Sequence, residues 1–91
     1  MNEKELQRLR DEINRINGEI IKLLAERVNL AKQIGEVKKI LGKPIIDSNR
    51  EASVYEQVKK LAYDMNLDQE GIEKVFKEII RLSVEAQEEE Q

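Results

Sequence analysis

The chain has 91 residues and a net charge of −3, with no cysteine, no histidine and 3% aromatic residues. The missing Cys and His exclude disulfides, the usual zinc sites, and Ser-His-Asp or Cys-His catalysis, so we expect no metal. The few aromatic residues and the modest charge argue against nucleic acid as a partner. A single core of this size is marginal by itself, which leaves a second chain as the source of further stability.

Apolar residues predict one long helix over about residues 3–41. They recur at alternating spacings of three and four, which is the a/d pattern of a coiled-coil seam interrupted once by Arg27. The seam residues are Leu6, Leu9, Ile13, Ile16, Ile20, Leu23, Arg27, Leu30, Ile34, Val37 and Leu41. Such a helix is about 58 Å long, whereas a compact monomer of this length is only about 30 Å across. We therefore expect a homodimer, in which the helix lies against a second copy of itself.

Two shorter helices are predicted at about residues 49–63 and 69–88. Gly42 and Pro44 end the long helix, because Gly suits a left-handed cap and Pro cannot continue a helix. The second helix starts with Ser48 in a capping box or with Asp47 as the N-cap, and Asp68 caps the third. The inner face of the second helix is predicted to consist of Val54, Tyr55, Val58, Leu61 and Ala62. With no strand pattern, the whole chain reads as a single all-α domain.

Basic residues gather in the first part of the chain. Residues 1–50 carry 11 Lys and Arg against 8 Asp and Glu, while residues 51–91 carry 5 against 11. This distribution suggests an anionic ligand near the long helix. The alternative is a solvated helix with ion pairs four residues apart.

Arg27 stands in the apolar seam, where its partial desolvation costs several kcal/mol unless it is paired. Lys38 follows eleven residues later, within about 20° of the same face and about 16 Å along the axis, so both side chains can hold one small dianion. Arg10 is about 25 Å from Arg27 on the same helix. It can serve the same pocket only from an antiparallel partner chain. A seam Arg can instead set register or oligomeric state.

Further polar residues follow the apolar stripes of the two short helices. Ser83 and Gln87 are four residues apart and continue the stripe of the third helix, although polar residues near a helix end are usually solvated. Asp47, Arg50 and Glu51 stand at the start of the second helix, where they also fit ordinary helix-start chemistry. Together these groups include cations, carboxylates, a hydroxyl and an amide, but no activated nucleophile. This set suits binding and stabilisation of an anionic transition state better than covalent catalysis.

The sequence resembles the all-helical class of chorismate mutases over about residues 5–88. The matching motifs are Leu9-Arg10 with Ile13 and Ile16, Leu24-Ala25-Glu26-Arg27 with Leu30-Ala31, Lys38, Pro44, Asp47-x-x-Arg50-Glu51, and Ser83-x-x-x-Gln87. Each motif is weak alone, but the ordered set is specific. The chain departs from the family at Asn14 and Asn17, where members more often carry Asp. Gly18 lies inside the helix, where Gly lowers helix stability by about 1 kcal/mol relative to Ala.

The resemblance implies an intertwined homodimer of three-helix chains whose two active sites each use both chains. It implies the Claisen rearrangement of chorismate to prephenate in phenylalanine and tyrosine biosynthesis, with no covalent intermediate and no cofactor. No dehydratase, dehydrogenase or regulatory domain is recognisable, so the stand-alone, monofunctional type is expected. The same resemblance implies that Arg27 and the partner's Arg10 hold the two substrate carboxylates, with Arg50 and Ser83 assisting.

The resemblance also implies roles for the remaining polar residues. Lys38 and Gln87 would donate hydrogen bonds to the ether oxygen, where negative charge develops as the C–O bond breaks. Glu51 and the backbone near Asp47 would take the ring hydroxyl. In this view Lys38, Gln87 and Arg27 are the catalytic residues, because contacts that strengthen in the transition state raise the rate.

Four other functions are alternatives from the sequence. An isochorismate-pyruvate lyase or an aminodeoxychorismate mutase would resemble this family in fold and cationic pocket. A non-catalytic helical dimerisation module would explain the seam without a substrate, and a nucleic-acid-binding helix pair is disfavoured by the acidic second half. No apolar run reaches the roughly 18 residues of a membrane span and no signal-peptide core is present, so we expect a soluble cytoplasmic protein without a membrane partner.

Overall fold

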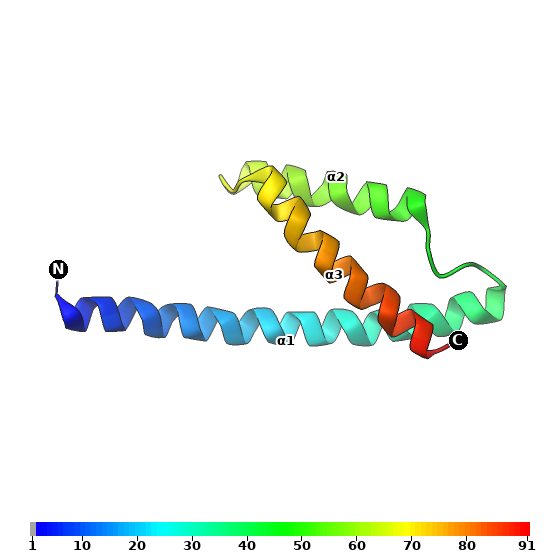
Figure 1. Ribbon diagram of the computed structural model, residues 1–91, viewed down its shortest axis with the longest axis horizontal. Helices are drawn as coiled ribbons and strands as arrows, with labels where there is room; N and C mark the ends of the chain where they lie inside the picture. The colour runs from blue at the N-terminus through cyan, green and yellow to red at the C-terminus, as the bar shows by residue number, and fades with distance from the viewer. Residues whose placement is uncertain (1) are drawn as a thin grey trace.

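The computed structural model describes residues 2–91 and consists of three helices joined by two short connections (Figure 1). They are α1 (Glu3–Leu41), α2 (Ser48–Asp64) and α3 (Gln69–Glu89). The prediction of an all-helical chain with three helices is confirmed, and residues 2–91 contain no strand. α3 runs back diagonally from the end of α2 to α1 and packs against both, whereas the backbones of α1 and α2 do not come close to each other over the described residues.

Side-chain caps define where the helices begin. Asn2, Asp47 and Asp68 each accept a hydrogen bond from the backbone N–H three residues later, at 2.9, 3.0 and 3.0 Å. Asp47 is therefore the N-cap of α2, and Ser48 is its first helical residue, which decides between the two predicted alternatives. Gly42 ends α1 in the left-handed conformation, with φ of 67°, as predicted. These caps fix the direction in which each helix leaves its connection.

The hydrophobic core lies between α2 and α3. Val54, Val58 and Ile80 are buried at its centre. Around them pack Tyr55, Ile72, Phe76 and Val84. The predicted inner face of α2 is wrong at Leu61, which is 55% exposed. The buried residues of α2 are Val54, Val58 and Ala62, which are four apart and form one row along the helix. Leu61 precedes Ala62 by one residue, so it lies about 100° around the helix from this row.

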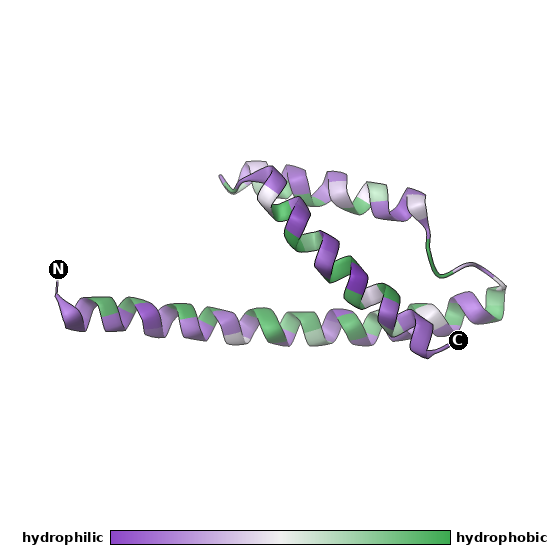
Figure 2. Ribbon diagram, viewed as in Figure 1, coloured by the Kyte–Doolittle hydropathy of each residue, from purple (hydrophilic) through white to green (hydrophobic). Residues whose placement is uncertain are grey.

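The apolar seam of α1 is uncovered. The N-terminal half of α1 lies apart from the other two helices and its end projects beyond them (Figure 1), and the molecule measures 59 × 25 × 15 Å. Hydrophobic bands recur along this projecting half (Figure 2), where Ile13 is 57% exposed. The seam remains exposed further along, with Val37 at 53%. A continuous apolar stripe of this length is unusual on the surface of a monomer and typical of an interaction surface.

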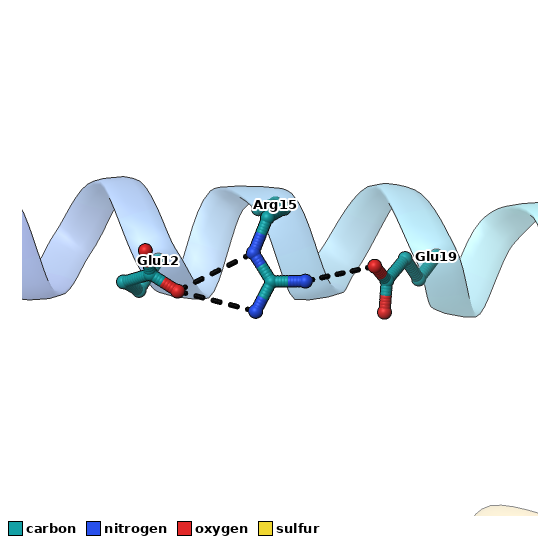
Figure 3. A network of polar contacts seen from close by, with 3 residues as sticks. All are labelled: Glu12, Arg15 and Glu19. Carbon is teal, nitrogen blue, oxygen red and sulfur yellow. Dashed lines mark hydrogen bonds and ion pairs between the residues drawn. The ribbon is translucent and has the colours of Figure 1, made fainter.

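Ion pairs support the solvent side of the projecting half of α1. Figure 3 shows Arg15 between Glu12 and Glu19, with N–O distances of 3.1 and 2.8 Å. Exposed pairs at these spacings stabilise a helix by a few tenths of a kcal/mol each. They favour the helical conformation without covering any of the apolar seam. Within residues 2–91, no helix is both long enough and apolar enough to cross a membrane.

Candidate active site

A cavity of about 370 Å³ lies where the C-terminal half of α1, the start of α2 and the end of α3 come together. This volume falls in the usual range for small-molecule sites. All seven polar residues that the sequence assigns to the site from its own chain line this cavity: Arg27, Lys38, Asp47, Arg50, Glu51, Ser83 and Gln87. Its apolar walls are formed by Leu30, Ala31, Ile34, Ile45, Val54, Ile80 and Val84.

The Arg27 guanidinium is held at the cavity wall by α3. Its Nη1 donates a hydrogen bond to Ser83 Oγ, and the Ser83 hydroxyl in turn donates to the Ile79 carbonyl at 3.2 Å. Ser83 is buried, so its hydroxyl is a fixed acceptor that orients Arg27. Burial, and secondarily the positive charge of Arg50, lower the pKa of Arg27. Both effects disfavour an isolated cation, and both are relieved by an anion bound between the two guanidinium groups.

Lys38 joins three parts of the site. Its Nζ donates to Gln87 Oε1 at 2.8 Å and to the Ile45 carbonyl at 2.5 Å. It thereby connects α1 to α3 and to the extended link before α2. Because Gln87 Oε1 accepts from Lys38, the Nε2 protons of this amide are left to donate to a ligand. Gln87 is only 7% exposed, so its orientation is set within the protein.

The first turn of α2 contributes the remaining polar groups. The Asp47 carboxylate is occupied as the N-cap, because Oδ1 accepts from the Arg50 backbone N–H. The Arg50 and Glu51 side chains both line the cavity from the first turn of α2. The site therefore offers a cation and a hydrogen-bond acceptor side by side at one end.

The arginines of the chain fall into two groups. Three of them, Arg8, Arg15 and Arg81, form exposed ion pairs with glutamates of their own helix. No salt bridge within residues 2–91 involves the other three, which are Arg10, Arg27 and Arg50. Lys38 likewise has no carboxylate partner among the described residues. The cations predicted for the site thus form no ion pair with a carboxylate of the described residues, as expected for groups that bind an external anion.

Arg10 lies outside the cavity of its own chain. It is exposed on the projecting half of α1, 17 residues before Arg27, which corresponds to about 25 Å along the helix. The structure of one chain therefore assembles every predicted site residue except this one.

Sequence reasoning missed two kinds of contributor to the site. The Ile45 carbonyl, which accepts from Lys38, is a backbone group and has no signature in the sequence. Of the apolar walls from α2 and α3, Val54 and Ile80 were predicted only as stripe positions, because stripe residues look alike whether they meet another helix or a ligand, and Val84 was not predicted. Residues 2–91 contain no cluster of three or more Asp, Glu, His or Cys side chains placed to bind a metal ion.

Comparison with known proteins finds a family, two relatives and a solved structure that are similar to most of this chain. A family model described as chorismate mutase type II matches residues 9–88. A chorismate mutase of Methanocaldococcus jannaschii is 39% identical over 77 residues, which covers 85% of this chain and 78% of that protein. A bifunctional chorismate mutase/prephenate dehydratase of Aquifex aeolicus is 41% identical over 85% of this chain, which spans only 22% of that longer protein. The solved structure of a conserved hypothetical protein from Pyrococcus furiosus superimposes with a TM-score of 0.74 and 34% identity, covering 94% of this chain and 99% of that one.

Proposed function

The chain belongs to the chorismate mutase type II family, and we propose that the cavity between its three helices is where it converts chorismate to prephenate. This reaction feeds phenylalanine and tyrosine biosynthesis. We further propose that the working form is an intertwined homodimer in which each cavity is completed by Arg10 of the second copy. The cytoplasmic location predicted from the sequence stays a prediction.

The unpaired cations support binding of a dicarboxylate. Chorismate carries two carboxylates, one on the ring and one on its enolpyruvyl side chain. In the proposed complex Arg27 and the partner's Arg10 hold these two groups, and Arg50 assists from α2. Fixing both carboxylates folds the flexible side chain over the ring before the barrier is crossed, so the entropic cost is met by binding. Ser83 contributes by orienting the Arg27 guanidinium.

Lys38 and Gln87 supply hydrogen bonds to the breaking C–O bond. The ether oxygen gains negative charge in the transition state, so donors aimed at it bind the transition state more tightly than the substrate. The Lys38 ammonium and the Gln87 Nε2 amide can both donate to it, because Lys38 uses two of its three protons on Gln87 Oε1 and the Ile45 carbonyl and keeps the third. At the other end, Glu51 accepts from the ring hydroxyl, together with the backbone near Asp47.

The exposed seam of α1 supports the dimer. Its apolar residues continue past the last contact with α3 and remain uncovered in a single chain. Burying one such side chain completely is worth about 1.5–3 kcal/mol, so a partner helix along the whole seam adds stability that this small core lacks. An antiparallel second copy also brings its Arg10 toward the cavity.

The single observation that carries the proposal is the convergence of Arg27, Lys38 and Arg50 on one cavity without a carboxylate partner in residues 2–91. It is tested by incubating the purified protein with chorismate and, separately, with isochorismate. Prephenate from chorismate supports the proposal. Salicylate and pyruvate from isochorismate alone would identify a lyase, and no product from either substrate would favour a non-catalytic dimerisation module.

The site assignment is tested with Arg27→Leu and, as a matched control, Arg15→Leu. We expect Arg27→Leu to lose at least about a hundredfold in kcat/KM, while removal of a desolvated charge from the seam raises the thermal midpoint. Arg15→Leu, which loses only exposed ion pairs, should keep its activity. Near-full activity of Arg27→Leu would show that the site is elsewhere. Light scattering on each variant measures the mass in solution, and an active monomer would contradict the shared site.

A further inference from the structure

Gly35 lies at a point of close approach between α1 and α3. It is buried, and a Cβ added to it would lie 2.9 Å from Gln87 Cα and 3.0 Å from the Gln87 carbonyl oxygen. Both are backbone atoms, so no side-chain rotation can relieve the overlap. Any larger residue at this position must push the end of α3 away from α1. The Gly35 carbonyl also accepts a hydrogen bond from Gln91 Nε2 at 3.0 Å, which ties the last residue of the chain to the same point.

The residue that Gly35 contacts is the one that Lys38 orients. Lys38 follows Gly35 by three residues, about one turn along the same face of α1. Its Nζ is 2.8 Å from Gln87 Oε1, close to the ideal length for a charge-assisted hydrogen bond. Hydrogen bonds weaken steeply beyond their normal range, so a displacement of α3 by about 1 Å would break this contact and release the Gln87 amide.

We propose that Gly35 is a positioning residue for the rearrangement: its missing side chain lets α3 approach α1 closely enough for Lys38 to orient the Gln87 amide toward the breaking bond. The inference rests on the proposed function and adds to it a residue outside the cavity lining. Of the groups proposed to bind the carboxylates, Arg27 is oriented from α3 by Ser83, whereas Arg50 comes from α2 and Arg10 from the second copy. Substrate binding therefore depends less on the position of α3 than the transition-state contacts do. The two kinetic constants should therefore respond differently.

The test is Gly35→Ala, with Gly18→Ala as the matched control on the same helix. An added Cβ at Gly18 meets no atom within 4 Å, and this position lies on the side of α1 away from the apolar seam. We expect Gly35→Ala to lower kcat about tenfold or more, because small misplacements of catalytic groups are costly. KM should change by less than about threefold. Gly18→Ala should keep both constants and raise the thermal midpoint.

A double-mutant cycle separates positioning from simple destabilisation. If Gly35 acts through Gln87, adding Gly35→Ala to Gln87→Ala should lower kcat further by less than about threefold. The same fold-loss in both backgrounds would overturn the proposal, as would wild-type kcat in Gly35→Ala. Should Gly35→Ala fail to fold, the cycle is run in the Gly18→Ala background, whose added helix stability offsets the loss. Absence of turnover in the unmodified protein would instead refute the proposed function.

Discussion

Separate inactive variants of Arg10 and Arg27 should restore activity when their subunits are mixed. The two residues are 17 positions apart on one continuous helix, so their backbones are about 25 Å apart and cannot reach one small substrate from the same chain. If each site takes Arg27 from one chain and Arg10 from the other, neither Arg10→Ala nor Arg27→Ala has a complete site as a homodimer. Each loses a charge-assisted contact to a carboxylate, worth about 3 kcal/mol or a hundredfold in kcat/KM.

The size of the recovery follows from the geometry. Random pairing of equal amounts of the two variants gives about half heterodimers. In each heterodimer one site has both arginines and the other has neither. About a quarter of all sites should therefore be complete, and the mixture should show about a quarter of the wild-type activity at saturating chorismate.

The assay unfolds the two variants in urea, mixes them and refolds them by dilution, with wild-type protein treated in the same way as the reference. Prephenate formation and the mass in solution are then measured on the refolded mixture. If Arg10 served the site of its own chain, no heterodimer would contain a complete site and the mixture would stay inactive. That result, or full activity of Arg10→Ala alone, would refute the shared site.

Three further predictions concern groups around the cavity. Lys38→Ala should lose at least about a hundredfold in kcat/KM while circular dichroism stays helical, whereas Lys39→Ala, an exposed neighbour outside the cavity, should keep its activity in the same steady-state assay. Asp47→Ala removes the N-cap of α2 and should lower the free energy of unfolding by about 1 kcal/mol in urea denaturation, with a rise in KM because Arg50 and Glu51 lie in that first turn. Burial and Arg50 lower the pKa of Arg27, but from the strongly alkaline range of arginine, and the chain has no His or Cys. We therefore expect kcat/KM to be constant between about pH 6 and 8 and to fall only as alkaline pH removes the cation, and a bell-shaped profile centred near neutrality would contradict this reasoning.

Much of the fold could be predicted because its signals are local. The a/d spacing from Leu6 to Leu41 specifies a long helix, and Gly42 marks its end by the conformation it alone adopts easily. Asp47 could not be chosen over Ser48 as the cap, because both residue types cap well and the choice depends on where α2 leaves the link. Leu61 was misplaced for a different reason. Its helix offers two adjacent apolar rows, and the angle at which α3 crosses α2 decides which row is buried.

The charged side chains of the candidate site could be predicted from the sequence, whereas its backbone contacts could not. Arg27 is conspicuous in the sequence because it interrupts an apolar seam, and a buried cation requires an explanation. The Ile45 carbonyl and the close approach at Gly35 carry no side-chain signal. They arise only when α3 crosses α1 and the link folds back over Lys38. Tertiary geometry thus adds to the site the contacts that orient its charges.

The charges of the site make ligand binding and stability interdependent. Arg27 is partly desolvated and faces Arg50, and residues 2–91 provide neither with a carboxylate partner, so the unliganded cavity holds an unfavourable excess of positive charge. The proposed rearrangement uses no nucleophile and requires this kind of field, since its transition state would be stabilised by fixed donors rather than by a covalent bond. Neutralising Arg27 with a glutamate of the protein would stabilise the fold and compete with the substrate carboxylate. In the proposed complex the same unpaired cation lowers the stability of the empty protein and provides affinity for a dianion, and in the proposed dimer a second chain along the α1 seam supplies stability that offsets the cost.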